Sequence, residues 1–117
     1  MTEIPSDPLA AAELARQALD YAAGAQSDIA HPTRSQFLAY GELLTSTLSE
    51  LESLTVVLAG QVARYGDHVV RGDDAEGIAN LQRTVRHLTE LAEVLHTGAL
   101  HAHGYWSELG RGTGTAR

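Results

Sequence analysis

Histidine and carboxylate side chains in the second half of the chain are the residues best suited to metal chemistry. Five of the six histidines lie between residues 68 and 103. Glu93 and His96 are three residues apart, so on a helix they share a face and both can reach one metal ion. His103 lies seven residues beyond His96, about 10.5 Å along a helix axis, so binding the same ion would need ligands from another helix. A metal site centred on Glu93, His96 and His103 is therefore one hypothesis.

The competing interpretation of these histidines is structural. By helical projection, His96 and His103 fall at the edge of an apolar stripe, where histidines are commonly half covered by their neighbours. Metal sites in carboxylate bundles need two Glu-x-x-His pairs, and this sequence has one. We therefore predict no metal and no cofactor, and keep a metal-binding or ligand-sensing bundle at Glu93, His96 and His103 as the alternative.

No stretch of the sequence carries a specific catalytic motif. The serines at positions 46, 49 and 53 lie in a helical pattern, without the Gly-x-Ser-x-Gly turn that exposes a nucleophile. There is no glycine-rich phosphate loop, and the lack of cysteine removes thiolate chemistry. We predict that the protein is not an enzyme and has no catalytic residues.

Composition and charge narrow the range of partners. The chain has 117 residues and a formal net charge of −7, and its eight basic residues are all arginine. Nucleic-acid binding needs clustered positive charge, so no nucleic-acid partner is expected. No apolar run approaches the ~20 residues of a membrane span, and no basic segment precedes an apolar one as in a Sec signal peptide. We expect a protein partner, no membrane contact and a cytoplasmic location.

Helical periodicity dominates the sequence and predicts an all-α protein. The longest apolar run extends from about Asp74 to Leu109, with apolar residues at steps of three and four. Its predicted inner face consists of Leu81, Val85, Leu88, Ala92, Leu95, Ala99, Ala102 and Trp106. A second run of ~30 residues follows the same period. Its apolar stripe consists of Phe37, Tyr40, Leu44, Leu48, Leu51, Leu54, Leu58, Val62 and Tyr65. Helices of ~50 Å need a long neighbour, so we expect these two runs to pack together.

Capping signals indicate where the first two helices begin and end. Asp7 followed by Pro8 predicts the start of a short, alanine-rich first helix. A break is expected over residues 24–32, which contain a glycine, polar turn residues and a proline. Thr33 begins a capping-box pattern ahead of the second helix, and Gly66 is placed to end that helix in the left-handed conformation.

A short connection over residues 66–73 forces the two long helices to be antiparallel. The third helix is expected to end at Gly110, because the following residues offer almost nothing apolar to anchor them. The predicted architecture is a three-helix bundle, made of a long antiparallel helical hairpin with a shorter N-terminal helix. It forms a single domain over residues 1–110, followed by a disordered tail over 111–117.

A small, acidic, cysteine-free helical hairpin resembles the WXG100 (ESAT-6-like) proteins of type VII secretion in shape. The chain lacks that family's Trp-x-Gly motif between the two long helices. Its tryptophan, Trp106, is followed by Ser107 and Glu108. It also lacks the Tyr-x-x-x-Asp/Glu export signal, since Leu109 stands four residues after Tyr105. The resemblance is therefore disfavoured as an assignment.

Two further stretches, Val62–His68 and Ala102–Leu109, are similar to small uncharacterised helical proteins of actinobacteria. The similarity covers the last two predicted helices. It implies a helical fold and supplies no site residues.

Apolar residues outside the predicted stripes suggest how the protein works. Two long helices and one alanine-rich helix cover the apolar surface only in part. Leu43, Val57, Val94 and Leu100 lie off the main stripes and lack an obvious partner within the chain. We therefore predict a non-enzymatic helical interaction module that acts through self-association or association with a partner protein, a homodimer being one form. Those four residues are its predicted interaction residues.

Overall fold

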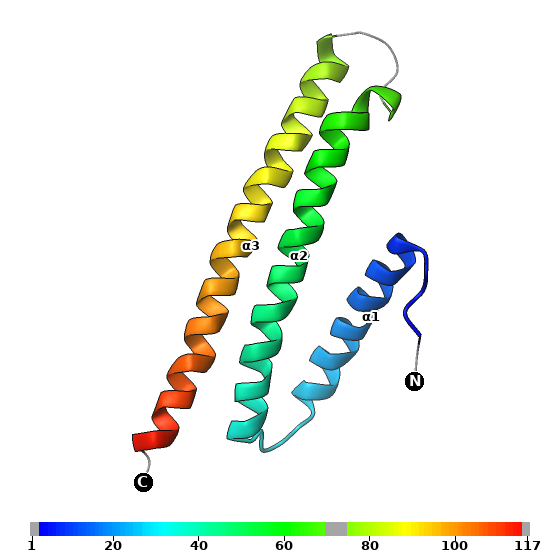
Figure 1. The fold of residues 1–117 in the computed structure, drawn as a ribbon. Coiled ribbons are helices and arrows are strands. Elements are labelled where there is room, and N and C mark those ends of the chain that lie inside the picture. Colours follow the sequence, from blue (N-terminus) through cyan, green and yellow to red (C-terminus); the bar gives the residue numbers. More distant parts are fainter. Residues whose placement is uncertain (1–2, 70–74, 116–117) are drawn as a thin grey trace. The chain divides into compact units, whose positions relative to one another are not determined.

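The computed structural model describes residues 3–69 and 75–115 of the chain, which form three helices (Figure 1). Helix α1 spans Pro8–Ser27, α2 spans Arg34–Val69 and α3 spans Ala75–Thr115. Helix accounts for 89% of the structure, and no strand occurs in the described residues. The predicted all-α, three-helix fold is confirmed. The chain divides into two compact units, residues 1–33 and 34–117, so the packing of α1 on the hairpin stays a prediction, as does the single domain.

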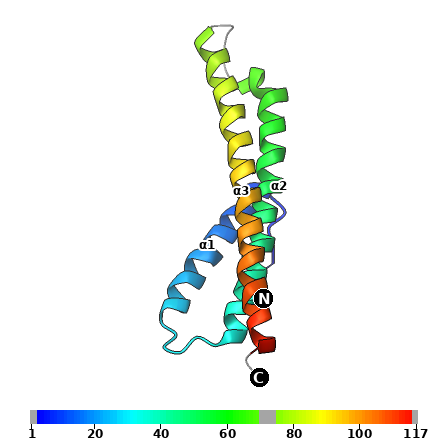
Figure 2. The same cartoon turned by 90° about the vertical axis from the view of Figure 1, so that its left-hand side faces the viewer.

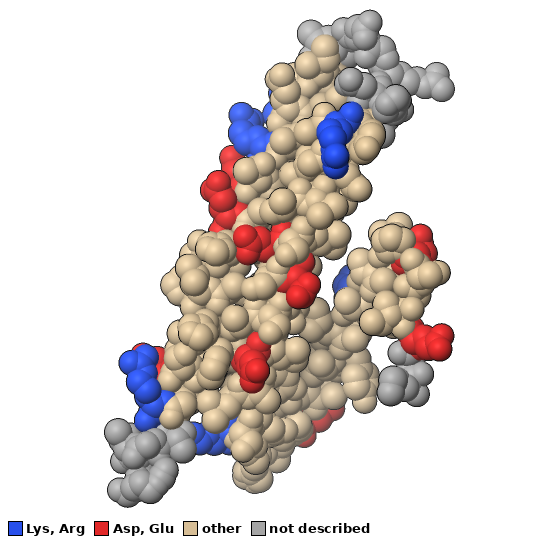
Figure 3. Space-filling view, in the orientation of Figure 1, with Lys and Arg blue, Asp and Glu red and all other residues tan. Residues whose placement is uncertain are grey.

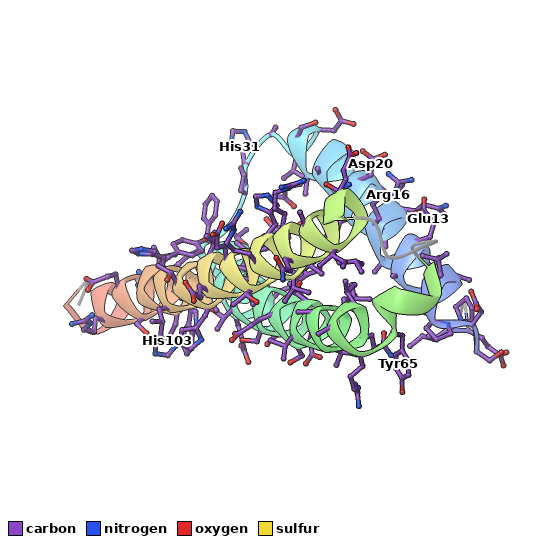
Figure 4. The ribbon with its side chains drawn as sticks, turned by 90° about the horizontal axis from the view of Figure 1, so that it is seen from above. Glu13, Arg16, Asp20, His31, Tyr65 and His103 are labelled. Atoms are coloured by element: carbon purple, nitrogen blue, oxygen red, sulfur yellow. The ribbon has the colours of Figure 1, made fainter. Side chains whose placement is uncertain are left out.

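The start of α1 follows the predicted capping geometry. Asp7 has an extended backbone, and its carboxylate accepts a hydrogen bond of 2.9 Å from the Ala10 N–H, with Pro8 in the first turn. On the surface of α1, Arg16 forms an ion pair of 2.6 Å with Glu13 (Figure 4). The hydrogen bond from Arg16 lowers the pKa of Glu13 below its ordinary value. Because side chains three residues apart meet on a helix, this pair supports α1 locally.

Two predicted helix ends are corrected by the structure. The break expected from Gly24 begins later, because α1 continues to Ser27, whose hydroxyl donates to the Gly24 carbonyl at 2.7 Å. Gly66 does not end α2, which continues to Val69. Gly66 is instead buried inside the helix, where a Cβ would lie 2.6 Å from the Leu81 Cδ2 atom. Its role is close packing against α3 and not chain reversal.

The end of α3 also differs from the sequence-based expectation. The helix extends past Gly110 to Thr115. Arg111 pairs with Glu108 at 2.5 Å, and such a pair adds support to a last turn rich in glycine. Part of the predicted connection, residues 70–73, and the end of the predicted tail, residues 116–117, lie outside the described residues. The predicted disorder of the tail remains a prediction.

Helices α2 and α3 run antiparallel and pack along their length, as Figures 1 and 2 show. The residues of α2 that are buried or half-buried against α3 alternate in steps of four and three. The residues in this repeat are Gly41, Thr45, Leu48, Glu52, Thr55, Ala59, Val62 and Gly66, and four residues near the start of α2, Gln36, Leu38, Tyr40 and Thr47, are half-buried outside it. On α3 the predicted face is confirmed, since every one of its eight residues is buried or half-buried. This seven-residue repeat on both helices is the pattern of an antiparallel coiled coil.

The most deeply buried residues between α2 and α3 are small. The buried apolar residues are Ala92, Ala99 and Ala102, and Thr55 is buried with its hydroxyl bonded to the Leu51 carbonyl at 2.7 Å. No large side chain among the described residues is fully buried. Small side chains let the two backbones approach closely, but they remove little apolar area from water. The two helices of the hairpin are therefore close together, but their contact buries little apolar surface.

The open end of the hairpin, where α2 starts and α3 ends, carries the most specific contacts. The Tyr105 hydroxyl donates to the Phe37 carbonyl at 2.8 Å, and Arg34 donates to the Leu109 carbonyl. Trp106 packs against Gly41. Its indole Nε1 is buried without a hydrogen-bond partner in the described part of the chain. The glycine lets α2 come close to the Cα and Cβ atoms of Trp106.

Candidate interaction surface

The structure does not bring the three candidate metal ligands together. The Nδ1 atom of His96 lies 3.3 Å from Glu52 Oε1 on α2. His103 is nearest to neighbours on its own helix, with Nε2 3.5 Å from Ser107 Oγ and its ring edge-on to Trp106 at 5.3 Å. Within residues 3–69 and 75–115, no group of three histidine, aspartate or glutamate side chains is placed to hold an ion.

The pairing of His96 with Glu52 connects the two long helices. Glu52 occupies a position of the α2–α3 interface that is otherwise formed by small and apolar residues, and its side chain is about one-third exposed. A polar residue at one core position of a coiled coil favours a particular alignment of the helices. The structure thus pairs His96 with a carboxylate on the other long helix, which the sequence pattern of Glu93 and His96 did not reveal.

Metal addition gives a first test of this geometry. We expect micromolar zinc or nickel to leave the melting temperature of the protein unchanged, because a stabilising ion needs several converging ligands in the folded state. Circular dichroism melting curves with and without the metal measure this. A rise that disappears in the Glu93→Ala, His96→Ala double variant would instead establish the metal-binding alternative.

The four predicted interaction residues are all exposed. Their exposed fractions are 51% for Leu43, 53% for Val57, 66% for Val94 and 62% for Leu100. None of them is used to hold α2 against α3. Their predicted role in association stays a prediction.

A larger exposed apolar surface lies on the predicted stripe of α2, and this corrects the expectation that the stripe packs on α3. Of that stripe, Leu48 and Val62 belong to the repeat that faces α3, and Tyr40 is half-buried. Five residues spaced by seven are between 41% and 53% exposed. They are Phe37, Leu44, Leu51, Leu58 and Tyr65. Leu54, between them on the same side, is also exposed. Helix α2 therefore carries two seven-residue repeats, one facing α3 and one facing outward.

Residues of α3 extend this surface across the hairpin. The bond from Tyr105 to the Phe37 carbonyl shows that Tyr105 lies beside the exposed stripe. Leu91, fourteen residues earlier, shares the helical position of Tyr105 and is also exposed. We call this surface the apolar face. It consists of Phe37, Leu44, Leu51, Leu54, Leu58 and Tyr65 of α2 with Leu91 and Tyr105 of α3.

A groove deepens the apolar face near the connection between the two helices. Its volume is about 550 Å³, and both helices line it. The lining includes Leu58, Gln61, Val62 and Tyr65 of α2 and Leu81 and Thr84 of α3. These residues are apolar or uncharged, so the groove suits an apolar or aromatic side chain.

The opposite flank of the hairpin, which we call the polar flank, carries charged side chains together with exposed apolar ones such as Val56, which follows Glu52 by four residues. The Glu52–His96 pair marks it, and Leu100 lies there because it follows Glu93 by seven residues and His96 by four. On the face shown in Figure 3, acidic side chains gather over the middle of the hairpin, while arginine side chains lie toward its ends. Leu43 and Val57 border the apolar face, and Val94 is one turn from Leu91. Of the four predicted residues, Leu100 is thus the one that lies away from the apolar face.

No protein-family model, curated protein or solved structure matches the chain. Within the described residues, none of the helices combines the length and apolar character required to cross a membrane.

Proposed function

We propose that this protein is a non-enzymatic helical interaction module that works by association through the apolar face. The observation that supports the proposal is the distribution of apolar side chains. Five of the seven leucines of α2, together with Phe37 and Tyr65, are exposed, while glycine, threonine and alanine occupy five of the eight α2 positions in the repeat that faces α3. A sequence that only had to form a hairpin would gain more by placing its leucines in that contact.

Energetics support the same proposal. Full burial of a leucine or aromatic side chain contributes roughly 1.5–3 kcal/mol, so a half-exposed one retains about 1 kcal/mol of unused stabilisation. The apolar face holds eight such residues on one side of the hairpin. Contiguous apolar surface of this kind marks interaction sites in soluble proteins.

The absence of charge on the face also supports association. The outward repeat of α2 occupies nine positions over about 40 Å of helix, and none of the nine is charged. They are Phe37, Tyr40, Leu44, Thr47, Leu51, Leu54, Leu58, Gln61 and Tyr65. The charged residues of α2 nearest to this surface, Glu42, Glu50 and Arg64, lie beside it and not on it. Depletion of charged residues is the compositional mark of an interface centre.

Hydroxyl-radical footprinting tests the proposal directly on the full chain. We expect labelling of Phe37, Leu51 and Tyr65 to fall as protein concentration rises from about 1 to 100 µM, a range that spans common dissociation constants, or when an extract of the source cells is added. Labelling of Leu100, on the polar flank, should stay constant and serves as the internal control. Equal labelling of all four residues under every condition would contradict association through the apolar face.

A further inference from the structure

We propose that the occupant of the apolar face is a second copy of this chain, bound antiparallel, with Phe37 of each copy seated in the Leu58–Tyr65 groove of the other. This inference rests on the proposed function and specifies its partner. The result is a four-helix arrangement of two hairpins related by a two-fold axis.

The residue pattern of the face is self-complementary. Around Leu51 the repeat is nearly symmetric, with Leu44 and Leu58 seven residues away on either side and the aromatic residues Phe37 and Tyr65 at the two ends. An antiparallel second copy brings leucines against leucines at the centre and an aromatic end against each groove. A two-fold interface requires this property, since the same patch serves on both partners.

The groove lies at the position where antiparallel pairing would place Phe37 of the second copy. Pairing α2 antiparallel around Leu51 places Phe37 of one copy opposite residues near Tyr65 of the other. Those residues line the groove, whose volume of about 550 Å³ leaves room for an aromatic ring. Phe37 is itself exposed, at the end of the face away from its own groove. Each copy thus offers one aromatic knob and one matching hole.

The available area suits a second copy as the partner. Each chain carries a net charge of −7, which repels a second copy at long range, but the apolar face brings no like charges into direct contact. The face is about 40 Å long and about 20 Å wide across two packed helices. Its footprint of about 800 Å² per partner equals that of a stable, specific interface.

Spin-label distances test the orientation. Because the chain has no cysteine, Glu50→Cys and Arg64→Cys each provide one labelling site on the exposed border of the face. In the full chain we expect pulsed electron resonance to give a distance below about 20 Å for the label at 50. The label at 64 should give about 40 Å, the axial separation set by antiparallel pairing around Leu51. Short distances for both labels mean parallel association, and overturn this inference while leaving the proposed function standing.

A matched pair of variants tests the groove. Thr84 lines the groove, whereas Thr89 lies outside it, and each donates its hydroxyl to the carbonyl four residues earlier. Thr84→Trp should fill the groove and weaken the dimer at least about tenfold, while Thr89→Trp should leave the dissociation constant unchanged. Equal effects, or no distance between labels because the protein is monomeric, would overturn the second-copy assignment. If footprinting still shows that another protein protects the apolar face, the proposed function stands and the second-copy assignment fails.

Discussion

Replacing Gly41 with alanine is expected to destabilise the hairpin by about 2–3 kcal/mol. A Cβ at position 41 would overlap the Trp106 Cβ and lie 3.1 Å from the Trp106 Cα and 3.0 Å from the Tyr105 Cε2. Two of these atoms belong to rigid parts of α3, so the helices must separate where α2 starts. Thermal unfolding followed by circular dichroism should show a melting temperature lower by about 10–20 °C.

Gly60 supplies the matched control for this prediction. It lies in the same helix, and a Cβ there meets nothing within 4 Å. Gly60→Ala should therefore stabilise α2 by about 0.5–1 kcal/mol, the helix-propensity difference between the two residues. If both substitutions raise the melting temperature, the close approach of α2 to α3 at Gly41 is wrong.

Replacing Leu51 with aspartate is expected to abolish association while leaving the chain helical. Leu51 is 42% exposed at the centre of the apolar face, so an aspartate there stays hydrated in the separate chain. In a two-fold dimer the same substitution brings two unpaired carboxylates into one buried contact, at a cost of several kcal/mol. The dissociation constant should rise at least about a hundredfold, as measured by fluorescence-detected sedimentation.

Leu100→Asp is the control for Leu51→Asp. Leu100 is more exposed than Leu51 but lies on the polar flank with Glu93 and His96. The substitution should change neither the dissociation constant nor the helical content measured by circular dichroism. A loss of association in Leu100→Asp with none in Leu51→Asp would move the interface to the opposite side of the hairpin.

The inner face of α3 was predictable because its apolar residues form a single stripe. From Leu81 to Trp106 the sequence places apolar residues at one set of helical positions and mainly polar ones elsewhere. With one stripe there is one choice of packing face, and periodicity identifies it. The capping of α1 by Asp7 was equally predictable, because a local carboxylate-to-backbone bond depends on adjacent residues alone.

The inner face of α2 was not predictable from periodicity, because this helix has two repeats. The stronger apolar signal, through Leu44, Leu51 and Leu58, faces outward. The contact with α3 uses smaller residues such as Gly41 and Thr55, which an apolar periodicity does not identify as buried. Their seven-residue spacing was present in the sequence. The preference for a close helix contact, however, depends on the α3 alanines opposite, which a reading of α2 alone does not include.

Long-range pairs also escaped the sequence analysis. His96 was considered with Glu93, its neighbour on the same helix, whereas its carboxylate partner is Glu52, forty-four residues earlier. Such a pairing depends on the alignment of two helices, which capping and periodicity leave undetermined. The end of α2 was missed for a related reason, since glycine lowers helix propensity locally but Gly66 packs against Leu81 of α3 and the helix continues.

The mass of the purified full chain in solution tests most directly whether the apolar face of the hairpin is an association surface. Sedimentation equilibrium at about 10 µM, where a dimer with a micromolar dissociation constant is well populated, should give about twice the mass of one chain. Leu51→Asp should give the mass of one chain, with its far-ultraviolet spectrum retained. A wild-type protein that sediments as one chain and binds no other protein, or a Leu51→Asp variant that remains associated, would contradict the account.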